Sequence, residues 1–576
     1  MLKRKDVAEC VIERVDYPNC GRYKTEEGQK LTVKNTLPGQ RIRCRIFKKH
    51  QDRVEGRLFE IVEKSPLETR EKVCDNFPLC GGCLCQTMPY EDQLAMKEDM
   101  VRRLLDEVVD DAVYDGILRS PLEFEYRNKM EFSFGDDVEN GPLTLGLHRR
   151  NTTYTVLNAH SCALAHKDMR KILGATLDYC REMGLKKYDK KIHKGFLRFL
   201  LVRRSQTTGE LLVYIVTSSQ QEHDFSDWAD RLLALPIEGS YAGIFHAIDD
   251  KMSDAVKVDY ATPLYGKEYF YEELLGLKFK VTAFSFFQTN TPGAEVLYDA
   301  VRRYVTGGVP GQNTPGQEDG GDRSSKAEKV CVDGNRSGSP VLYDLYSGTG
   351  TIGQVLSPVA GKVYGIELIP EAVDAARENV ALNGITNCEF IAGDVLEKLA
   401  ELPEKPDYIV LDPPREGINP KALAQIIDYG VGEMVYISCK ASSFKRDMVT
   451  LRANGWRVKR YCLVDLFPQT MHVEAVCLLS KLSGAKHHVS ITLDMEEMDL
   501  TAAESKATYQ EIQEWVQEKY GFHVSHLNIA KTKRKCGIIE RKNYNLPKSE
   551  DSWSPETPKE KEEAIREAFK YFQMID

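Results

Sequence analysis

The second half of the chain alternates regularly between short apolar segments and helical stretches, and this alternation constrains the fold most strongly. Between residues 341 and 439 there are five apolar segments: "VLYDLYSG", "KVYGIEL", "CEFIAGD", "DYIVLDPP" and "EMVYISC". A stretch with helical character separates each segment from the next. Strands that are joined through helices pair in parallel, so the alternation predicts an α/β fold with a doubly wound parallel sheet.

A glycine-rich turn follows the first of these predicted strands. In "DLYSGTGTIG", Gly348, Gly350 and Gly353 lie between a strand and a helix, and Glu367 ends the next strand. Glycines let the backbone turn tightly and approach a ligand, and a carboxylate at this distance can accept both hydroxyls of a ribose. The spacing also matches the dinucleotide fingerprint. A nicotinamide enzyme and an ordinary α/β turn therefore both remain alternatives at this point.

Two later strand ends favour a different ligand. Asp394 ends "FIAGD", and Asp412 ends "DYIVLD" just before two prolines. Ligands of open sheets bind at the carboxyl ends of strands, so acidic residues at three successive strand ends are expected to surround one ligand. In this arrangement they resemble the S-adenosylmethionine site of class I methyltransferases. The resemblance implies that S-adenosylmethionine is the cofactor, rather than NAD.

A cysteine and a glutamate supply the candidate chemistry. Cys439 ends the next strand, "VYISC", and Glu474 lies in the later segment "DLFPQTMHVEAVCLL". The Asp-Pro-Pro strand end also resembles the pocket of amino-methyltransferases, but those enzymes need no cysteine. A thiolate that adds to carbon 6 of uracil makes carbon 5 nucleophilic, and a carboxylate can then remove the carbon 5 proton. The pair therefore indicates a carbon acceptor.

Together these motifs resemble the RNA uracil-5-methyltransferases, specifically the iron–sulfur-containing 23S ribosomal RNA group. The similarity covers residues 1–480 apart from an insertion at 307–340. It implies that Cys439 is the nucleophile and Glu474 the proton acceptor. It also implies a 23S rRNA substrate, with transfer RNA as the alternative. The methyl-donor site that the family and class I resemblances imply consists of Gln288 from "FSFFQTNT", Tyr346, Glu367, Asp394 and Asp412.

The chain departs from the family directly after the cysteine. Family members usually have Asn-Pro there, whereas this chain has Lys440 and Ala441. Without the proline the turn is less constrained, and a lysine beside the thiol is expected to lower the pKa of the thiol. We expect activity to be retained. A catalytically weak RNA-binding assembly factor is the alternative that this departure favours, and an N-methyltransferase is a third.

Four cysteines form a candidate metal site. "CDNFPLCGGCLC" contains Cys74, Cys80 and Cys83, and Cys162 follows in "NAHSCALAH". Four thiolates can hold zinc or a [4Fe-4S] cluster, and the spacing does not choose between them. The family resemblance implies the iron–sulfur cluster, with Cys85 as an extra thiol that is not a ligand. In a reducing compartment, the fifteen cysteines are better explained by metal binding, catalysis and core packing than by disulfides.

The remaining segments predict three further parts around the α/β domain of residues 276–480. Residues 1–64 have short alternating segments with an excess of basic residues, and they resemble the TRAM module, an OB-like RNA-binding β-barrel. Residues 65–275 mix strand-like segments with helical ones and predict an α+β middle domain. Residues 307–340, rich in Gly, Pro and Ser, are expected to form a flexible insertion. Residues 481–576 predict a helical extension, either helix-turn-helix-like and RNA-binding or a simple packing element.

Individual helices can be predicted in two of these parts. In the middle domain, helical stretches are expected from Tyr90 to Val109 and from His166 to Met183. In the extension, apolar residues at helical spacing in "SKATYQEIQEWVQEKYGF" predict one helix, and the basic segment "HVSHLNIAKTKRK" predicts a second.

Charge and hydropathy limit the partners. The net charge of −9 does not by itself favour nucleic acid, but basic segments such as "LHRRN" and "KTKRK" provide local surfaces suited to RNA. No apolar run approaches the roughly eighteen residues needed to cross a bilayer, and the N-terminal "MLKRKDVAEC" is polar. We therefore expect a cytoplasmic monomer with no membrane partner.

Overall fold

The computed structural model describes residues 2–50, 53–252, 258–311, 339–481, 509–520, 522, 524–536 and 558–571. By its internal contacts the chain divides into two compact units, Met1–His488 and Val489–Asp576. Most of the predicted insertion, residues 312–338, lies outside the described residues. Within the described part, every helix is too short or too polar to cross a membrane.

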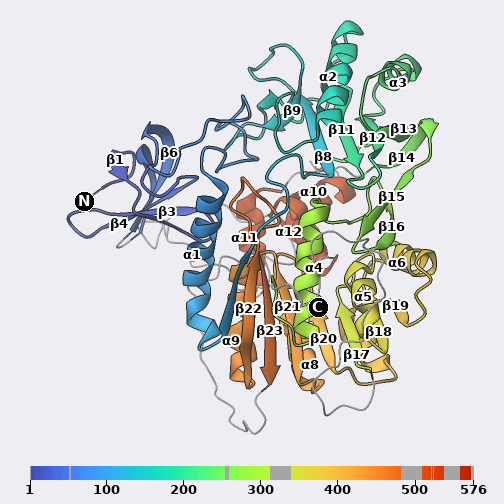
Figure 1. The fold of residues 1–576 in the computed structure, drawn as a ribbon. Helices are drawn as coiled ribbons and strands as arrows, with labels where there is room; N and C mark the ends of the chain where they lie inside the picture. The colour runs from blue at the N-terminus through green and yellow to red at the C-terminus, as the bar shows by residue number, and fades with distance from the viewer. Residues whose placement is uncertain are drawn as a thin grey trace. The chain divides into compact units, whose positions relative to one another are not determined.

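An eight-stranded sheet forms the centre of the first unit, in the order β19-β18-β17-β20-β21-β23-β22-β7 (Figure 1). The first five strands are parallel, and β23 runs antiparallel to both of its neighbours. The predicted α/β fold with a parallel sheet is therefore confirmed. In chain order the strands are β7 (Val113–Leu118), β17 (Val341–Leu345), β18 (Lys362–Glu367), β19 (Cys388–Ala392), β20 (Tyr408–Leu411), β21 (Glu433–Ser438), β22 (Trp456–Val464) and β23 (Glu474–Lys481).

Helices cover both faces of this sheet, because alternate side chains of its apolar strands point to opposite faces. On one face Ile409 and Tyr436 belong to the same core as Phe444. On the other face Val410 and Val435 share a core with Leu297. Phe444 lies on α9 and Leu297 on α4. The helices that belong to the sheet are α4 (Thr291–Val305), α5 (Thr351–Leu356), α6 (Pro370–Leu382), α7 (Val395–Lys398), α8 (Pro420–Asp428) and α9 (Ala441–Ala453), with short turns η1 (Ser357–Val359) and η2 (Leu399–Glu401).

One edge of the sheet is completed by a segment from far earlier in the chain. The strand β7 pairs in parallel with β22, with Leu118 beside Val464. It follows α1 (Tyr90–Val109), the first predicted middle-domain helix, which packs against α9 and β22. Both elements lie within the predicted middle domain, residues 65–275. The sheet of the predicted 276–480 domain thus includes a strand from outside that range, and the predicted domain boundaries remain predictions.

A second, seven-stranded sheet lies above the first in Figure 1, in the order β10-β9-β8-β11-β12-β13-β14. Two helices, α2 (Lys167–Glu182) and α3 (Ser226–Leu233), pack on it and bury Leu173 and Trp228 against strand residues such as Leu200. The strands are β8 (Lys129–Gly135), β9 (Thr144–His148), β10 (Val156–Asn158), β11 (Leu197–Arg204), β12 (Glu210–Thr217), β13 (Ser240–Ile248) and β14 (Tyr260–Gly266), followed by the hairpin β15 (Tyr269–Leu274) and β16 (Leu277–Thr282).

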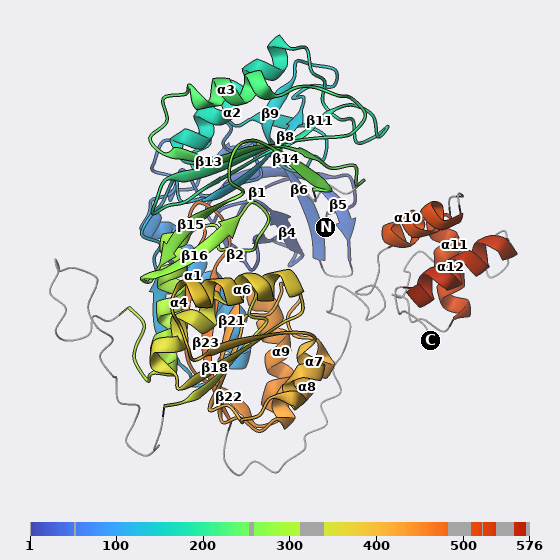
Figure 2. The same cartoon turned by 90° about the vertical axis from the view of Figure 1, so that its right-hand side faces the viewer.

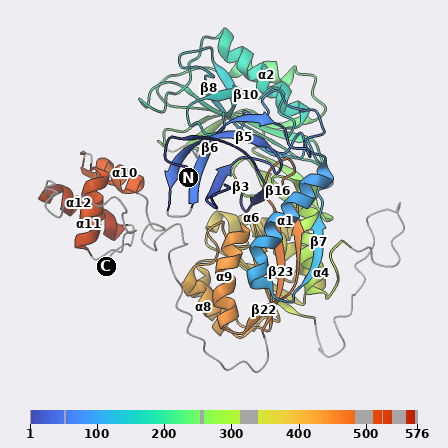
Figure 3. The same cartoon turned by 90° about the vertical axis from the view of Figure 1, so that its left-hand side faces the viewer.

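The N-terminal residues form a six-stranded sheet in the order β1-β5-β6-β4-β3-β2 (Figure 3). Its strands are antiparallel except for the parallel pair β4 and β6. This sheet packs on α1, where the Arg103 guanidinium donates to the Val15 carbonyl at 2.7 Å. The OB-like barrel remains a prediction. The strands are β1 (Val7–Val11), β2 (Arg14–Asp16), β3 (Cys20–Lys24), β4 (Lys30–Lys34), β5 (Arg41–Lys49) and β6 (Arg53–Glu63).

The second unit contains three described helices, α10 (Tyr509–Tyr520), α11 (His526–Lys535) and α12 (Lys559–Tyr571) (Figure 2). Ile512, Ile529 and Phe569 bring one side chain from each helix into a shared core. The first two helices agree with the predicted helical segments, while α12 was not predicted. The helix-turn-helix-like role of this unit remains a prediction.

Candidate active site and cysteine cavity

The glycine turn between β17 and α5 has a backbone that glycine makes possible. Gly348 and Gly350 have φ values of 54° and 73°. A Cβ on Gly350 would lie 2.6 Å from the ring of Phe390, so no larger residue fits. The buried Asp344 carboxylate accepts the Gly353 N–H at 2.8 Å and fixes the end of the turn. Burial raises the pKa of Asp344 to about 7.

The predicted donor-site residues Glu367, Asp394 and Tyr346 lie around this turn. The two carboxylate oxygens of Glu367 accept the N–H groups of Gly348 and Ile369, each at 3.0 Å. Burial raises the pKa of Tyr346 to about 12, and the charge of Asp394 contributes. The structure therefore brings the ends of β17, β18 and β19 together at one edge of the sheet.

The segment that contains Gln288 lies against the same turn. The Thr349 hydroxyl donates to the Phe286 carbonyl at 3.4 Å. Gln288 hydrogen-bonds to the buried Tyr298 on α4; burial raises the pKa of Tyr298, and the charge of Asp412 adds to the effect. Tyr298 is thus a neighbour of both Gln288 and Asp412, and no sequence motif pointed to it.

Two buried polar atoms of the turn lack a hydrogen-bond partner among the described residues. They are Oδ1 of Asp344 and Oγ of Ser347. An unsatisfied buried polar atom is unfavourable, and a bound ligand with polar groups is one way to satisfy it. Together with the carboxylate of Glu367, the turn is suited to a ligand with hydroxyl or amino groups. These residues therefore fit S-adenosylmethionine.

Strand pairing brings Cys439 and Glu474 together. Ser438 on β21 pairs with Ala475 on β23 in an antiparallel register. The next residues outward are Cys439, directly after β21, and Glu474, the first residue of β23. Residues at facing positions of antiparallel strands have Cα atoms about 5 Å apart. On the other side of β21, Asp412 directly follows β20, whose Leu411 pairs with Tyr436.

The side chains of Cys439, Glu474 and Asp412 all have raised pKa values. Burial raises the pKa of Cys439 to about 11, with further contributions from Glu474 and Asp412. Burial also raises the pKa of Glu474 to about 8, and Asp412 adds to this effect. The pKa of Asp412 is raised to about 7 by burial. At neutral pH the thiol and the Glu474 carboxyl are therefore mostly protonated.

Arg415 is the cation that opposes these shifts. Its charge lowers the pKa values of both Cys439 and Glu474. The expectation that Lys440 would lower the pKa of the thiol was wrong, because the net shift of Cys439 is upward and Lys440 is exposed. Sequence reasoning missed Arg415. The available signal was its place directly after the Asp-Pro-Pro strand end.

Tyr17, in the turn between β2 and β3 of the N-terminal sheet, contacts the segment that follows Cys439. The backbone N–H of Ala441 donates to the Tyr17 hydroxyl. Burial raises the pKa of Tyr17, and the charges of Cys439 and Glu474 add to this shift. The side chain of Lys440, the N-cap of α9, makes no capping hydrogen bond. Tyr17 therefore acts as a cap for the start of α9, beside the thiol. A proline at position 441 would have no N–H to make this contact.

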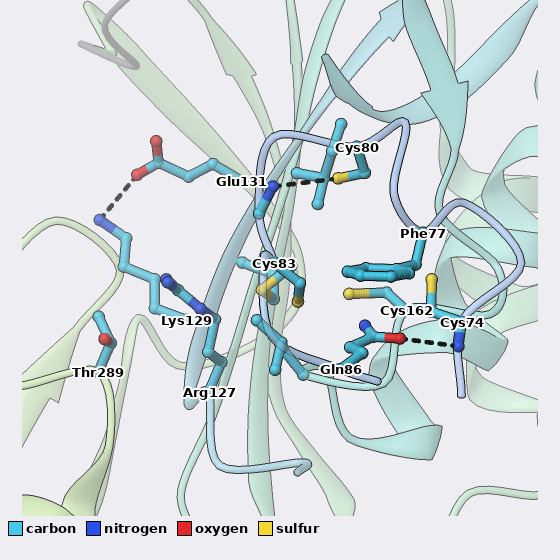
Figure 4. Close-up of a pocket in the computed structure, with 14 residues that line it drawn as sticks. Cys74, Phe77, Cys80, Cys83, Gln86, Arg127, Lys129, Glu131, Cys162 and Thr289 are labelled. Carbon is cyan, nitrogen blue, oxygen red and sulfur yellow. Dashed lines mark hydrogen bonds and ion pairs between the residues drawn. The ribbon is translucent and has the colours of Figure 1, made fainter. Parts of the chain in front are cut away.

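The four predicted ligand cysteines line a single cavity of about 400 Å³ (Figure 4). The Gly82 N–H donates to Cys80 Sγ at 3.3 Å, and the N–H groups of Leu164 and Ala165 lower the pKa of Cys162 against a larger upward effect of burial. Such N–H···S bonds are typical around metal-bound thiolates. Arg127, Lys129 and Thr289 also line the cavity.

The four cavity thiols are not arranged around one metal position. Among the described residues, no three His, Cys, Asp or Glu side chains are placed to hold one metal ion. Tetrahedral zinc needs all its sulfur ligands about 2.3 Å from the metal. Four thiols around one cavity are the donor set of either a zinc site or a four-thiolate cluster. The predicted metal centre is nevertheless not confirmed. Cys85 instead directs its thiol to Met471 Sδ at 3.7 Å.

Comparison with known proteins identifies the family. The family model described as tRNA (Uracil-5-)-methyltransferase matches residues 404–482, a range that includes Asp412, Cys439 and Glu474. An uncharacterized RNA methyltransferase of Caldanaerobacter subterraneus is 43% identical over 481 residues, which is 83% of this chain and 100% of the relative. This chain belongs to the RNA uracil-5-methyltransferase family. Another family relative, an uncharacterized RNA methyltransferase of Clostridium acetobutylicum, is 41% identical over 482 residues, 84% of this chain and 99% of the relative.

A solved structure supports the methyltransferase fold. The chain superposes on the Pyrococcus abyssi tRNA (uracil-54, C5)-methyltransferase in complex with S-adenosyl-L-homocysteine with a TM-score of 0.61. The two are 23% identical, and the match covers 82% of this chain and 100% of the other. This likeness supports the predicted α/β fold, and the relatives described above show that the chain is an RNA methyltransferase.

Proposed function

We propose that this enzyme transfers a methyl group from S-adenosylmethionine to carbon 5 of a uridine in RNA, through a covalent adduct between Cys439 and the uracil ring. The observation that carries this proposal is the strand register that puts Cys439 across from Glu474. The alternative of an N-methyltransferase leaves both side chains without a task.

In the proposed reaction, Cys439 acts as the thiolate. Its Sγ adds to carbon 6 of uracil, and the electron pair of the carbon 5–carbon 6 double bond makes carbon 5 nucleophilic. S-adenosylmethionine supplies the methyl group that carbon 5 takes, and its sulfur keeps the electron pair of the broken bond, so that it leaves as S-adenosylhomocysteine. The Glu474 carboxylate then removes the proton from carbon 5, the double bond re-forms and the bond from Sγ to carbon 6 breaks. Glu474 finally releases its proton to solvent, so the thiolate and the carboxylate are both regenerated.

The raised pKa values suit these roles unequally. Glu474, with a pKa of about 8, is near the operating pH, where a general base is most effective. Cys439, with a pKa of about 11, is mostly a thiol at neutral pH. The charge of Arg415 favours the thiolate of Cys439. Arg415 is therefore proposed to sustain the reactive form of both groups.

The methyl donor is proposed to bind at the glycine turn. Glu367 would accept the ribose hydroxyls, and Asp394 the adenine amino group. The unsatisfied Asp344 and Ser347 oxygens support a ligand at this place. The full proposed set is Gln288, Tyr346, Glu367, Asp394 and Asp412.

The cysteine cavity is proposed to hold a [4Fe-4S] cluster, with zinc as the alternative. Cys74, Cys80, Cys83 and Cys162 would be the ligands, and the shared cavity and the N–H···S bonds support this assignment. Such a cluster would link the loop around Cys74–Cys83 to Cys162, which lies between β10 and α2. Its proposed role is structural.

Ribosomal RNA is proposed as the substrate, with transfer RNA as the second candidate. The family resemblance favours 23S rRNA. Transfer RNA is favoured by the description of the family model and by the name of the Pyrococcus abyssi neighbour, since both mention transfer RNA. A target uridine must be unstacked to reach Cys439, and this costs a few kcal/mol. Binding by the basic N-terminal sheet, and by the three-helix unit if it is helix-turn-helix-like, would offset that cost.

Nucleoside mass spectrometry tests the proposal. Purified enzyme is incubated with S-adenosylmethionine and either 23S rRNA or transfer RNA transcripts, and 5-methyluridine is quantified. We expect 5-methyluridine in one RNA and none with Cys439→Ala, whereas the control Cys536→Ala, in the second unit, retains activity. Absence of any methylated nucleoside would favour the RNA-binding assembly factor. A methylated nitrogen would favour an N-methyltransferase.

A further inference from the structure

The turn that leads into Glu474, residues 465–473, is held in place by buried polar contacts. Asp465 Oδ1 lies 2.7 Å from Lys97 Nζ, and both side chains are completely buried. The Tyr126 hydroxyl donates to the Pro468 carbonyl at 2.9 Å. A buried ion pair and buried hydrogen bonds tolerate little displacement, because a broken contact leaves a charge or a polar group unsatisfied.

The same turn is fastened to the cysteine loop, which we define as residues 74–88. The N–H groups of Leu84 and Cys85 both donate to the Gln469 carbonyl, at 2.7 and 3.1 Å. The Cys85 thiol lies 3.7 Å from Met471 Sδ. The residues that follow Cys83 in the cysteine motif therefore bind the turn that delivers Glu474, although nearly four hundred residues separate them in sequence.

Gln93 on α1 joins the loop and the turn. Its Nε2, whose two N–H groups are shared among three acceptors, lies 3.1 and 3.0 Å from the carbonyl oxygens of Cys85 and Met88 and 3.0 Å from Gln469 Oε1. Its Oε1 accepts the Gln469 N–H at 3.1 Å. The side chain is fully buried. One amide thus connects the cysteine loop to the backbone and the side chain of Gln469.

Gln469 itself is in an unfavourable state. Its φ is 68°, which few residues other than glycine adopt. Its buried Nε2 has no hydrogen-bond partner among the described residues. Each of these features destabilises the folded state. Strain of this kind persists only where the surroundings over-determine a conformation, and it is concentrated at functional sites.

We propose that Gln93 is a positioning residue that locks the cysteine loop onto the 465–473 turn and so holds Glu474 in reach of the carbon 5 proton. This inference rests on the proposed role of Glu474. If Glu474 is displaced, Sγ still adds to carbon 6 and carbon 5 still takes the methyl group. The carbon 5–hydrogen bond then persists, so the methylated adduct on Cys439 accumulates instead of releasing product.

Trapping of this adduct on ordinary uridine RNA tests the proposal. The activity assay identifies which RNA the enzyme methylates. Full-length enzyme is incubated with an unmodified transcript of that RNA and S-adenosylmethionine. Denaturing gels and mass spectrometry then measure the protein–RNA adduct. We expect Gln93→Leu to raise the fraction of enzyme in a singly methylated adduct at least tenfold and to slow product release similarly. The control is Thr176→Val, which removes buried hydrogen bonds to Ile172 and Trp228, and we expect it to behave as wild type.

Two further variants separate the possible failures. Gln469→Gly relieves the positive φ, so it should fold, but it removes the side-chain bond to Gln93; we expect several-fold more adduct. Glu474→Gln is the benchmark for lost proton removal. If Glu474→Gln accumulates adduct while Gln93→Leu and Gln469→Gly match Thr176→Val, the positioning role is wrong. If Glu474→Gln itself accumulates none, the proposed role of Glu474 fails, and the inference fails with it.

Discussion

Cys439 and Glu474 occupy facing positions at the ends of two neighbouring antiparallel strands, one step beyond the pair Ser438 and Ala475. The thiol and the carboxyl therefore lie side by side, and each makes the negative charge of the other less favourable. Asp412 adds to this repulsion, and Arg415 opposes it. The balance among these four groups determines how the site responds to pH and to substitution.

Arg415→Ala should shift the pH dependence of methyl transfer to higher pH. Arg415 lowers the pKa values of Cys439 and Glu474, and both groups act in their deprotonated forms. Without the guanidinium, less of each is deprotonated at pH 7.5. A shift of about 0.5 to 1 pKa unit in either group would reduce its deprotonated fraction about three- to tenfold there; the part due to Glu474 should recover above pH 9, and the part due to Cys439 only as the pH approaches 11. Arg415→Lys keeps the charge and should retain the wild-type profile. An equal loss at every pH would instead assign Arg415 to RNA contact.

Glu474→Gln should stabilise the protein at pH 8 and have little effect at pH 4.5. The pKa of Glu474 rises from its usual 4.5 to about 8 in the folded state. Between these values the folded state binds a proton that the unfolded state lacks, so the free energy of unfolding falls as pH rises. Removing the charge should restore on the order of 1 to 3 kcal/mol at pH 8. Urea unfolding at both pH values measures this. The exposed Glu404→Gln is the control, and the idea fails if both variants respond alike.

Tyr17 and Ala441 should be energetically coupled. The Ala441 N–H donates to the Tyr17 hydroxyl beside Cys439. Tyr17→Phe removes the acceptor and Ala441→Pro removes the donor, and each should slow adduct formation about two- to tenfold through one lost hydrogen bond. The double variant should be no slower than the worse single variant, because both remove the same contact. Strictly multiplicative effects would show that the contact does not matter. Tyr23→Phe, also in the N-terminal sheet, controls for the loss of a hydroxyl.

Cys80→Ala and Cys85→Ala should differ in metal content. Cys80 lines the cavity with the other three proposed ligands, whereas Cys85 points to Met471. After anaerobic purification we expect about four iron atoms per wild-type chain and visible absorbance. Cys80→Ala should lose both and bind RNA less well, while Cys85→Ala retains them. One zinc per chain would establish the zinc alternative, and a colourless, metal-free but active wild type would rule out both.

Much of the central sheet could be predicted because its strands are continuous apolar runs. Tyr408–Leu411, for example, is buried along its whole length, as expected of a strand covered on both faces. The edge strand Val113–Leu118 was missed because it is short and only partly buried. Its place beside β22 depends on packing of α1, which no local pattern encodes.

Candidate site residues could be predicted where they end a strand of the central sheet. They could not be predicted where they belong to a different part of the fold. Cys439, Asp412 and Glu367 each follow from their position at a strand end. Tyr17 comes from another sheet, and nothing in its neighbourhood in the sequence indicates a contact with Ala441. The expectation for Lys440 failed because adjacency in sequence does not place a side chain. Lys440 is exposed at the start of α9, and Arg415 acts on the thiol instead.

The central claim is that Cys439 forms a covalent bond with carbon 6 of uracil during methyl transfer, and 5-fluorouridine RNA tests it most directly. Fluorine at carbon 5 cannot be removed as a proton, so the methylated adduct is trapped. The measurement is peptide mapping by mass spectrometry after nuclease and protease digestion. We predict a methylated 5-fluorouridine adduct on Cys439 in the wild type and none in Cys439→Ser. A wild-type enzyme that makes 5-methyluridine but forms no adduct, or forms it on another cysteine, would contradict this account.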